Sequence, residues 1–178
     1  MQVCADCYRD PPPIERVRAA FRHEGLARQL VLDLKYRRQR HLAPTLGGLL
    51  AASAPRDVDA LVPIPLHPAR RRERGFNQSE LLAVELGRRL RRPVVGETVR
   101  RTRDTVQQTG LSPRERLANV RGAFAVDGRL DGGRLLLVDD VCTTGATLYA
   151  CARALRAAGA ASVVAAVFTR ASYGVIEP

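Results

Sequence analysis

The run LLLVDDVCTTGAT at residues 135–147 constrains the fold of this chain more than any other feature of its sequence. It opens with four apolar residues, 135–138, which predict a strand buried on both faces, as strands are in a parallel sheet. Two adjacent carboxylates, Asp139 and Asp140, follow at the carboxyl end of that strand. A turn of small hydroxyl residues then leads into a helix, and in an open parallel sheet this edge is where ligands bind.

Apolar periodicity along the rest of the chain predicts alternating strands and helices. In chain order we expect strands at 17–21, 60–64, 94–95, 98–101, 123–126, 134–138 and 162–169, and helices at 26–36, 41–52, 77–90, 113–120 and 144–158. Asn77 and Glu80 have the N-cap and N3 spacing of a capping box, and the polar segment 103–110 predicts a mobile loop. Because the last strand, helix and strand have crossover spacing, the fold class is α/β, with a central, mainly parallel sheet flanked by helices.

The turn after the two acids has the composition of an anion site. Backbone N–H groups from Thr143 to Thr147 would converge at a helix N-terminus, where the first N–H groups lack intrahelical partners and the dipole favours negative charge. Gly145 and Ala146 leave room for a phosphate, and the threonines add hydroxyl donors. Beside a phosphate, Asp139 and Asp140 would accept hydrogen bonds from sugar hydroxyls or hold a hydrated Mg2+. A simple strand end with a capped helix needs one such residue, not the whole run.

Several blocks of sequence together resemble a known family. The 135–147 run is similar to the phosphoribosyl pyrophosphate (PRPP) signature of type I phosphoribosyltransferases. The blocks that resemble the ComF/GntX family are VPIPLHP at 62–68, RGFNQS at 74–79, Gln107 or Gln108, and RLAN at 116–119 with Phe124; the similarity runs from about Cys4 to Tyr173. The resemblance implies a type I phosphoribosyltransferase fold with a small N-terminal hood. Residues 1–13 would form a residual Cys-x-x-Cys, partial zinc-finger-like stub with a proline linker, and 14–178 the phosphoribosyltransferase domain.

The resemblance also implies a ligand site. The two acids would contact the ribose hydroxyls of PRPP, the turn 143–147 its 5′-phosphate and the loop 63–67 its pyrophosphate, while Arg101 and Arg103 would close over the leaving group. The implied PRPP-binding residues are Val138, Asp139, Asp140, Thr143, Thr144, Gly145, Ala146, Thr147, Pro63, Ile64, Pro65, Leu66, His67 and Arg74. The implied catalytic residues are Asp139, Asp140, Arg101 and Arg103. Mg2+ would bind through the substrate, with Asp139 and Asp140 as its candidate protein ligands.

The implied reaction is transfer of the phosphoribosyl group to a nitrogen nucleophile with release of pyrophosphate. The sugar would pass through a state with oxocarbenium character, as in glycoside hydrolysis. Mg2+ and arginines would neutralise the charge of the departing pyrophosphate, and closure of a loop would exclude water. No segment identifies the acceptor, so a purine, a pyrimidine and an amine all stay open.

Cys4 and Cys7 form a Cys-x-x-Cys pair, which in a reducing compartment is half of a zinc site or a redox pair. A tetrahedral zinc needs four ligands, and the other two cysteines, Cys142 and Cys151, lie far down the chain. We therefore expect Zn2+ as a cofactor only if another segment or chain completes the half-site. Cys142 and Cys151 are expected to be small buried residues.

Composition narrows the classes of function. The 29 basic and 18 acidic residues give a net charge of +11, and Lys35 is the single lysine. Because Tyr36 follows Lys35, the sequence excludes a P-loop nucleotide site. It also lacks the short motifs of serine hydrolases, zinc peptidases and dinucleotide-binding proteins. The apolar runs are too short to span a bilayer and no signal-peptide apolar region is present, so we expect a cytoplasmic protein without membrane insertion.

The arginine excess supports a second interpretation from a different class. An arginine-rich surface attracts anions, and the resemblance links the family to uptake of transforming DNA. This predicts a non-catalytic accessory that binds single-stranded DNA or a helicase partner. Single-strand binders also use aromatic stacking platforms, and along the sequence the aromatic residues do not alternate with the arginines. The expected partners are PRPP with its acceptor, single-stranded DNA or DNA-uptake proteins, and a second copy of the chain.

Overall fold

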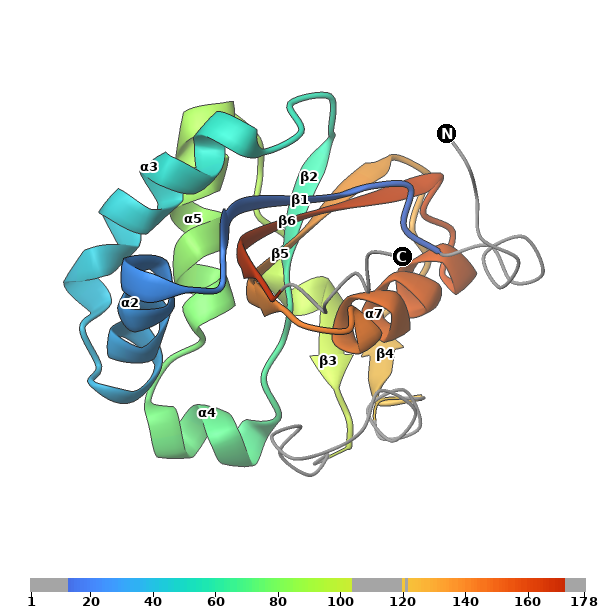
Figure 1. Cartoon of the computed structure of the whole chain (residues 1–178). Coiled ribbons are helices and arrows are strands. Elements are labelled where there is room, and N and C mark those ends of the chain that lie inside the picture. The colour runs from blue at the N-terminus through green and yellow to red at the C-terminus, as the bar shows by residue number, and fades with distance from the viewer. Residues whose placement is uncertain (1–12, 104–119, 121, 172–178) are drawn as a thin grey trace, which may run out of the picture.

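The computed structural model describes residues 13–103, 120 and 122–171. At its centre lies a four-stranded parallel sheet with the order β1-β6-β5-β2 (Figure 1). The elements, with 3-10 turns written η, are β1 Val17–Arg22, α2 Gly25–Tyr36, η1 Arg40–Leu42, α3 Ala43–Ser53, β2 Ala60–Pro63, α4 Pro68–Arg74, α5 Gln78–Leu90, η2 Gly96–Thr98, β3 Val99–Arg101, β4 Phe124–Val126, β5 Arg134–Cys142, α7 Ala146–Ala157 and β6 Ser162–Arg170. The expected α/β class is confirmed.

Parallel register brings the carboxyl ends of the central strands together. Val138 of β5 pairs with Pro63 of β2, so the loop after β2 begins beside the acid pair. Residues 93–95 run parallel to β2 at the free edge of the sheet. Leu61 of β2 donates its N–H to Pro93 O and accepts the N–H of Val95. β3 and β4 form a separate antiparallel pair.

Alternate side chains of β5 pack on opposite faces of the sheet. Leu136 and Val138 join the core beneath α2, α3 and α5, and Leu135 and Leu137 join the core beneath α7. Figure 1 shows α7 apart from the group formed by the other three helices. The largest fully buried side chains are Phe168, Leu34, Leu46, Leu50, Leu61, Leu82, Leu86, Leu136, Leu137, Leu148, Leu155 and Val31.

Gly47 allows α3 to approach α5 closely. A Cβ atom at Gly47 would lie 2.5 Å from Cβ of Glu85, a separation that side chains do not adopt. The absence of a side chain there lets the two helices pack together against the sheet. As a result, the first turn of α5 is held at the same edge as the carboxyl ends of β2 and β5.

Most predicted elements are present, but the expected strand at 94–95 is only an isolated bridge between Val94 and Leu61. The bounds of β5 and α7 also differ from the prediction, and one helix was not predicted. β5 does not stop at Val138 but continues to Cys142, because its backbone stays paired with β6 as far as Arg170. α7 begins at Ala146 rather than Thr144, since Gly145 before it has left-handed backbone. The basic segment after residue 67 forms helix α4, for which Pro68 stands at the first position and Gly75 at the C-cap.

The capping box is present only in part. Asn77 is the N-cap of α5, but its side chain accepts the N–H of Ser79, and Glu80 pairs with Arg71 on α4. The expected helix at 113–120 falls almost entirely outside the described residues, and the loop at 103–110 does so beyond its first residue. Within the described ranges no helix is both long enough and apolar enough to cross a membrane.

Candidate functional site

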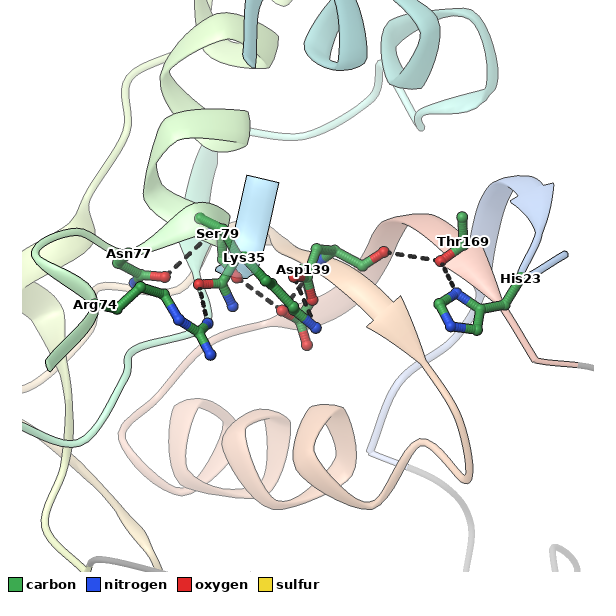
Figure 2. A network of polar contacts seen from close by, with 9 residues as sticks. His23, Lys35, Arg74, Asn77, Ser79, Asp139 and Thr169 are labelled. Atoms are coloured by element: carbon green, nitrogen blue, oxygen red, sulfur yellow. Dashed lines mark hydrogen bonds and ion pairs between the residues drawn. The ribbon is translucent and has the colours of Figure 1, made fainter. Parts of the chain in front are cut away.

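Asp139 and Asp140 lie near the carboxyl end of β5, and both side chains are buried. Figure 2 shows the polar network around them. The hydroxyl of Ser79 donates to Asp139 Oδ1 over 2.7 Å, and the N–H of Asp140 donates to the same oxygen over 3.0 Å. Lys35 Nζ lies 2.8 Å from Asp140 Oδ2. Each acid therefore has its own partner, supplied by α5 for Asp139 and by α2 for Asp140.

Buried polar side chains of the described residues gather at this edge of the sheet. They are Asn77, Gln78, Ser79, Asp139, Asp140 and Thr169. Thr169 donates to the carbonyl of Asp140 and contacts Nδ1 of His23. Because buried polar groups cost free energy unless they are well bonded, their concentration at one place indicates a ligand site more than ordinary packing.

The electrostatics of the pair are unfavourable to two bare negative charges. Burial, followed by the neighbouring charge of Asp140, raises the pKa of Asp139 to about 7, while the Lys35 ammonium and the Ser79 hydroxyl act in the opposite direction. Burial and then the charge of Lys35 lower the pKa of His23. A ligand that brings hydroxyl donors or a cation would relieve this strain on Asp139, which makes the pair a candidate binding site.

A turn with left-handed backbone at Gly145 joins β5 to α7. Gly145 is buried with φ of 79°, and Thr144 Oγ1 accepts the N–H of Ala146 over 3.4 Å. A Cβ atom at Gly145 would lie 3.2 Å from the ring of Tyr149. Thr143, Thr144 and Thr147 are half-buried, so they can face a ligand at the surface. The expected turn 143–147 therefore directly follows the acid pair at the start of a twelve-residue helix.

Two predicted residues of this region belong to the core. The side chain of Val138 is fully buried, and its carbonyl accepts the N–H of Ile64 over 3.0 Å. Cys142 is buried beside the turn, and burial raises the pKa of its thiol. A thiol that holds its proton is a weak nucleophile, so Cys142 is a packing residue, as expected.

The loop after β2 begins against the acid pair and then reaches the surface. Pro63 and Ile64 are buried, whereas Pro65, Leu66 and His67 are half-buried. The carbonyl of Ile64 accepts a hydrogen bond from the side chain of Asn77. The structure thus brings the expected pyrophosphate loop to the same edge as Asp139.

Arg74 connects this edge to an exposed aromatic ring. Its Nη1 donates to Gln78 Oε1 over 2.6 Å, and its guanidinium lies 5.5 Å from the ring centre of Tyr36, which is 66 % exposed. Arg40 lies over the ring of Phe76 in the same way, at 4.6 Å. Two arginines of this region therefore lie over aromatic rings, of which Tyr36 is exposed and Phe76 is buried.

Arg101 and Arg103 stand at the end of β3. Arg101 is half-buried, with its guanidinium 5.6 Å from the ring centre of Phe124, and Arg103 is exposed. Arg101 also lines a cleft of about 1150 Å³ that it shares with Pro65 and Leu66. Neither acid nor the turn 143–147 lines this cleft, so the structure groups Arg101 with the loop after β2 rather than with the acids.

Sequence reasoning missed Lys35 and Ser79, which hold the acid pair, and the hydrogen bond from Asn77 to the loop after β2. Asn77 was expected only as the N-cap of α5. The one available signal for Lys35 was its uniqueness, since every other basic residue counted in the net charge is arginine. The lysine ammonium is a compact point charge, whereas the arginine guanidinium is a planar fork, so the two are not interchangeable beside a buried carboxylate. A single lysine in an arginine-rich chain therefore indicates a position that requires an ammonium.

The donor set fits a cation that arrives with a ligand. Within the described ranges there is no group of three or more acidic, histidine or cysteine side chains that could enclose a metal. Mg2+ usually keeps several waters and binds through one or two carboxylates together with substrate phosphates, and Asp139 and Asp140 supply that number. Cys4 and Cys7, the expected half of a zinc site, lie outside the described residues.

Comparison with known families agrees with the fold. The model of the phosphoribosyl transferase domain matches residues 75–177, more than half of the chain, and the match includes the first turn of α5, the acid pair and the turn before α7. The chain belongs to this family of phosphoribosyltransferase-like proteins.

Individual relatives narrow the assignment. The DNA utilization protein YhgH of Escherichia coli K12 is 36 % identical over 168 residues, covering 90 % of this chain and 74 % of the relative. Competence protein F of Haemophilus influenzae is 31 % identical, with 89 % and 74 % covered, and competence protein ComFC of Bacillus subtilis is 28 % identical, with 91 % and 69 % covered. Within the phosphoribosyltransferase-like proteins, the chain is a member of the ComF family.

Proposed function

We propose that the protein binds PRPP together with Mg2+ and transfers its phosphoribosyl group to a nitrogen nucleophile, releasing pyrophosphate. One observation supports this above all: a buried acid pair is followed directly by a left-handed glycine turn that opens a helix. Carboxylates beside an anion-binding turn suit a molecule that carries sugar hydroxyls next to a phosphate. The family assignment supports the same proposal.

In this proposal each group has a defined task. Asp139 and Asp140 accept hydrogen bonds from the two ribose hydroxyls, and the turn 143–147 donates to the 5′-phosphate. The loop 63–67 faces the pyrophosphate. Mg2+ bound with the ligand would supply charge neutralisation for the leaving group. Positioning and electrostatics do the work, because the sugar develops positive charge while pyrophosphate departs and no proton has to move first.

Arg74 is the arginine best placed to act on the ligand side. It is half-buried, it is the last residue of α4, and its guanidinium is held by Gln78, the neighbour of Ser79 in the first turn of α5. Arg101 and Arg103 keep their proposed role of covering the leaving group. A planar guanidinium can hold phosphate oxygens through two parallel hydrogen bonds, which suits a pyrophosphate.

Titration calorimetry with PRPP and Mg2+ tests the proposal. We expect heat of binding from the wild type, and its loss in the double variant Asp139→Asn/Asp140→Asn. Absence of heat from the wild type at millimolar PRPP would reject the proposal. Release of pyrophosphate on addition of purines, pyrimidines or amines would then identify the acceptor and show turnover.

A second function is favoured by a separate surface, which we call the arginine surface and define as residues 36–40 and 68–74. Its two segments are joined by Arg38, which donates to Glu73 O, and by Arg40, which donates to Gly75 O. Tyr36 offers an exposed ring beside these guanidinium groups. Basic side chains with an aromatic platform are what single-stranded nucleic acid binders use, so we propose that this surface binds single-stranded DNA.

Anisotropy of a labelled single strand tests this second function. Tyr36→Ala should weaken binding, because stacking of a base on a ring contributes about 1 to 3 kcal/mol. Arg88→Ala is the matched control, since Arg88 is an exposed arginine at the far end of α5. Equal affinity of the wild type and Tyr36→Ala would argue against a stacking platform. The names of the relatives, which mention competence and DNA utilization, support this second proposed function.

A further inference from the structure

Three consecutive side chains at the start of α5, residues 77–79, are polar and yet buried. The first turn of a surface helix normally faces water, so burial of Asn77 and Ser79 needs a reason. Their hydrogen bonds give one. Both bond to backbone or side-chain groups that belong to the two halves of the proposed ligand site.

Asn77 fixes the loop after β2. Its Oδ1 accepts the N–H of Ser79 over 3.0 Å, and its Nδ2 donates to Ile64 O over 3.0 Å. The N–H of Ile64 in turn donates to Val138 O on β5. The first residue of the loop that follows β2 is therefore held on both sides, by the helix cap through its carbonyl and by the central strand through its amide.

Ser79 fixes the first acid. Its hydroxyl donates to Asp139 Oδ1 over 2.7 Å, the shorter of the two hydrogen bonds that this oxygen accepts. Two donors on one oxygen determine the direction of the carboxylate plane. Because the N–H of Ser79 is bonded to Asn77, an unbroken path of hydrogen bonds leads from Ile64 to Asp139 through one helical turn. Figure 2 shows the part of this path from Asn77 to Asp139.

We propose that Asn77 and Ser79 are positioning residues that form a brace between the loop 63–67 and Asp139. The brace fixes the distance between the part of the site that faces a diphosphate and the part that holds a sugar. The proposal rests on the proposed function for the identity of the ligand. In this proposal, the RGFNQS block aligns the carboxyl ends of β2 and β5, which a single ligand must bridge.

The brace predicts a separation of effects between two variants. Asn77→Ser keeps a cap on α5 but cannot reach Ile64 O, and Ser79→Ala removes only the hydroxyl that Asp139 accepts. Calorimetry with pyrophosphate and with ribose 5-phosphate, each with Mg2+, should show about a 3- to 10-fold loss for pyrophosphate in the first variant and for ribose 5-phosphate in the second, as expected for one hydrogen bond. PRPP should be weakened in both.

Ser53→Ala is the matched control, since Ser53 donates to Leu50 O in α3 far from the acids. It should leave all three affinities unchanged. If Asn77→Ser and Ser79→Ala weaken both fragments equally, the two residues support the fold in general and the brace is wrong. A merely structural role would not separate the two fragments in this way.

If the wild type binds none of these compounds, the proposed function is rejected but the brace is not. The brace can then be tested by a measurement that needs no ligand. Amide hydrogen exchange should then be about tenfold faster at Ile64 in Asn77→Ser and at Asp140 in Ser79→Ala, because each amide is bonded to a group that the brace holds. Unchanged exchange at both amides would overturn the proposal. The amide of Leu148, in the first turns of α7, should exchange at the wild-type rate in every variant.

Discussion

The carboxyl edge of the sheet and the arginine surface differ in how their charges are held. At the edge, Asp139 and Asp140 are buried, and each is fixed by a side chain from another helix. On the arginine surface, Arg37 and Arg71 are exposed and pair with single acids at the rim, Asp33 and Glu80. Rim pairs of this kind contribute little to stability.

The two regions therefore suit different kinds of ligand. A buried network tolerates few arrangements, so a ligand bound there would be selected by its shape and by the position of its hydroxyl groups. An exposed cluster of cations attracts any polyanion, and its attraction falls as salt is added. Binding at the edge should therefore depend on single atoms, and binding at the arginine surface should depend on total charge.

Replacing the acids one at a time should produce the largest effects. Both Asp139→Asn and Asp140→Asn should weaken PRPP binding by about 10- to 100-fold, as loss of a hydrogen bond to a charged group does. Their stabilities at pH 8 should diverge. Asp139→Asn removes a poorly solvated charge and should raise the free energy of unfolding by about 1 to 3 kcal/mol, whereas Asp140→Asn leaves Lys35 without its partner and should lower it by a similar amount.

Urea unfolding of the two single variants would measure this divergence. Lys35→Met in the Asp140→Asn background is the control, because it removes the ammonium that the first change leaves unpaired and should recover stability. Equal destabilisation by both single changes would mean that the two acids share one environment, contrary to the separate partners seen here.

The pH dependence of stability should report Asp139 directly. Its pKa is raised from 3.8 to about 7 in the folded protein, so between these values the folded state binds the proton more tightly than the unfolded state. The free energy of unfolding should therefore fall as pH rises from about 4 to about 7, by up to roughly 1 kcal/mol per pH unit from this group. Asp139→Asn should remove that part of the fall; unfolding curves that keep the wild-type slope would contradict the assignment.

Gly145→Ala should separate backbone strain from ligand binding. A left-handed alanine costs roughly 1 kcal/mol, and here its Cβ would also meet Tyr149. Gly128 has φ of 81° with open space around it, so Gly128→Ala carries the strain alone. We expect both variants to lose stability by thermal unfolding and only Gly145→Ala to bind ribose 5-phosphate about tenfold more weakly. If Gly145→Ala and Gly128→Ala bind ribose 5-phosphate equally well, the turn 143–147 is not the phosphate site.

The arginine surface should give the smallest and most salt-dependent effects. Arg71→Ala/Arg72→Ala should lower the affinity for single-stranded DNA a few-fold. The slope of log affinity against log salt should become shallower by about 1.4, the value for two lost phosphate contacts on a single strand. A DNA affinity that responds neither to salt nor to these changes would rule out this surface as the contact.

How much could be predicted from sequence depended on the range of the interaction. The apolar run before Asp139 and the glycine after Thr144 are local signals, and they placed β5, the turn and α7 correctly to within a few residues. Lys35 could not be placed beside Asp140, because only the completed sheet brings α2 to β5. Helix α4 was not predicted, because the arginines at 70–74 suggested a solvated turn. Its two ends are nevertheless marked in the sequence by Pro68 and Gly75.

The strand order of the sheet has a consequence for synthesis. β1, Val17–Arg22, leaves the ribosome early, yet its neighbour β6, Ser162–Arg170, is the last element that the described residues form. β6 also stands between β1 and β5. A nascent chain that stops before residue 162 carries Lys35 and both acids but has no strand to join α2 to β5. Prematurely ended products should therefore lack the arrangement of Lys35 and the acid pair on which the proposed ligand site depends.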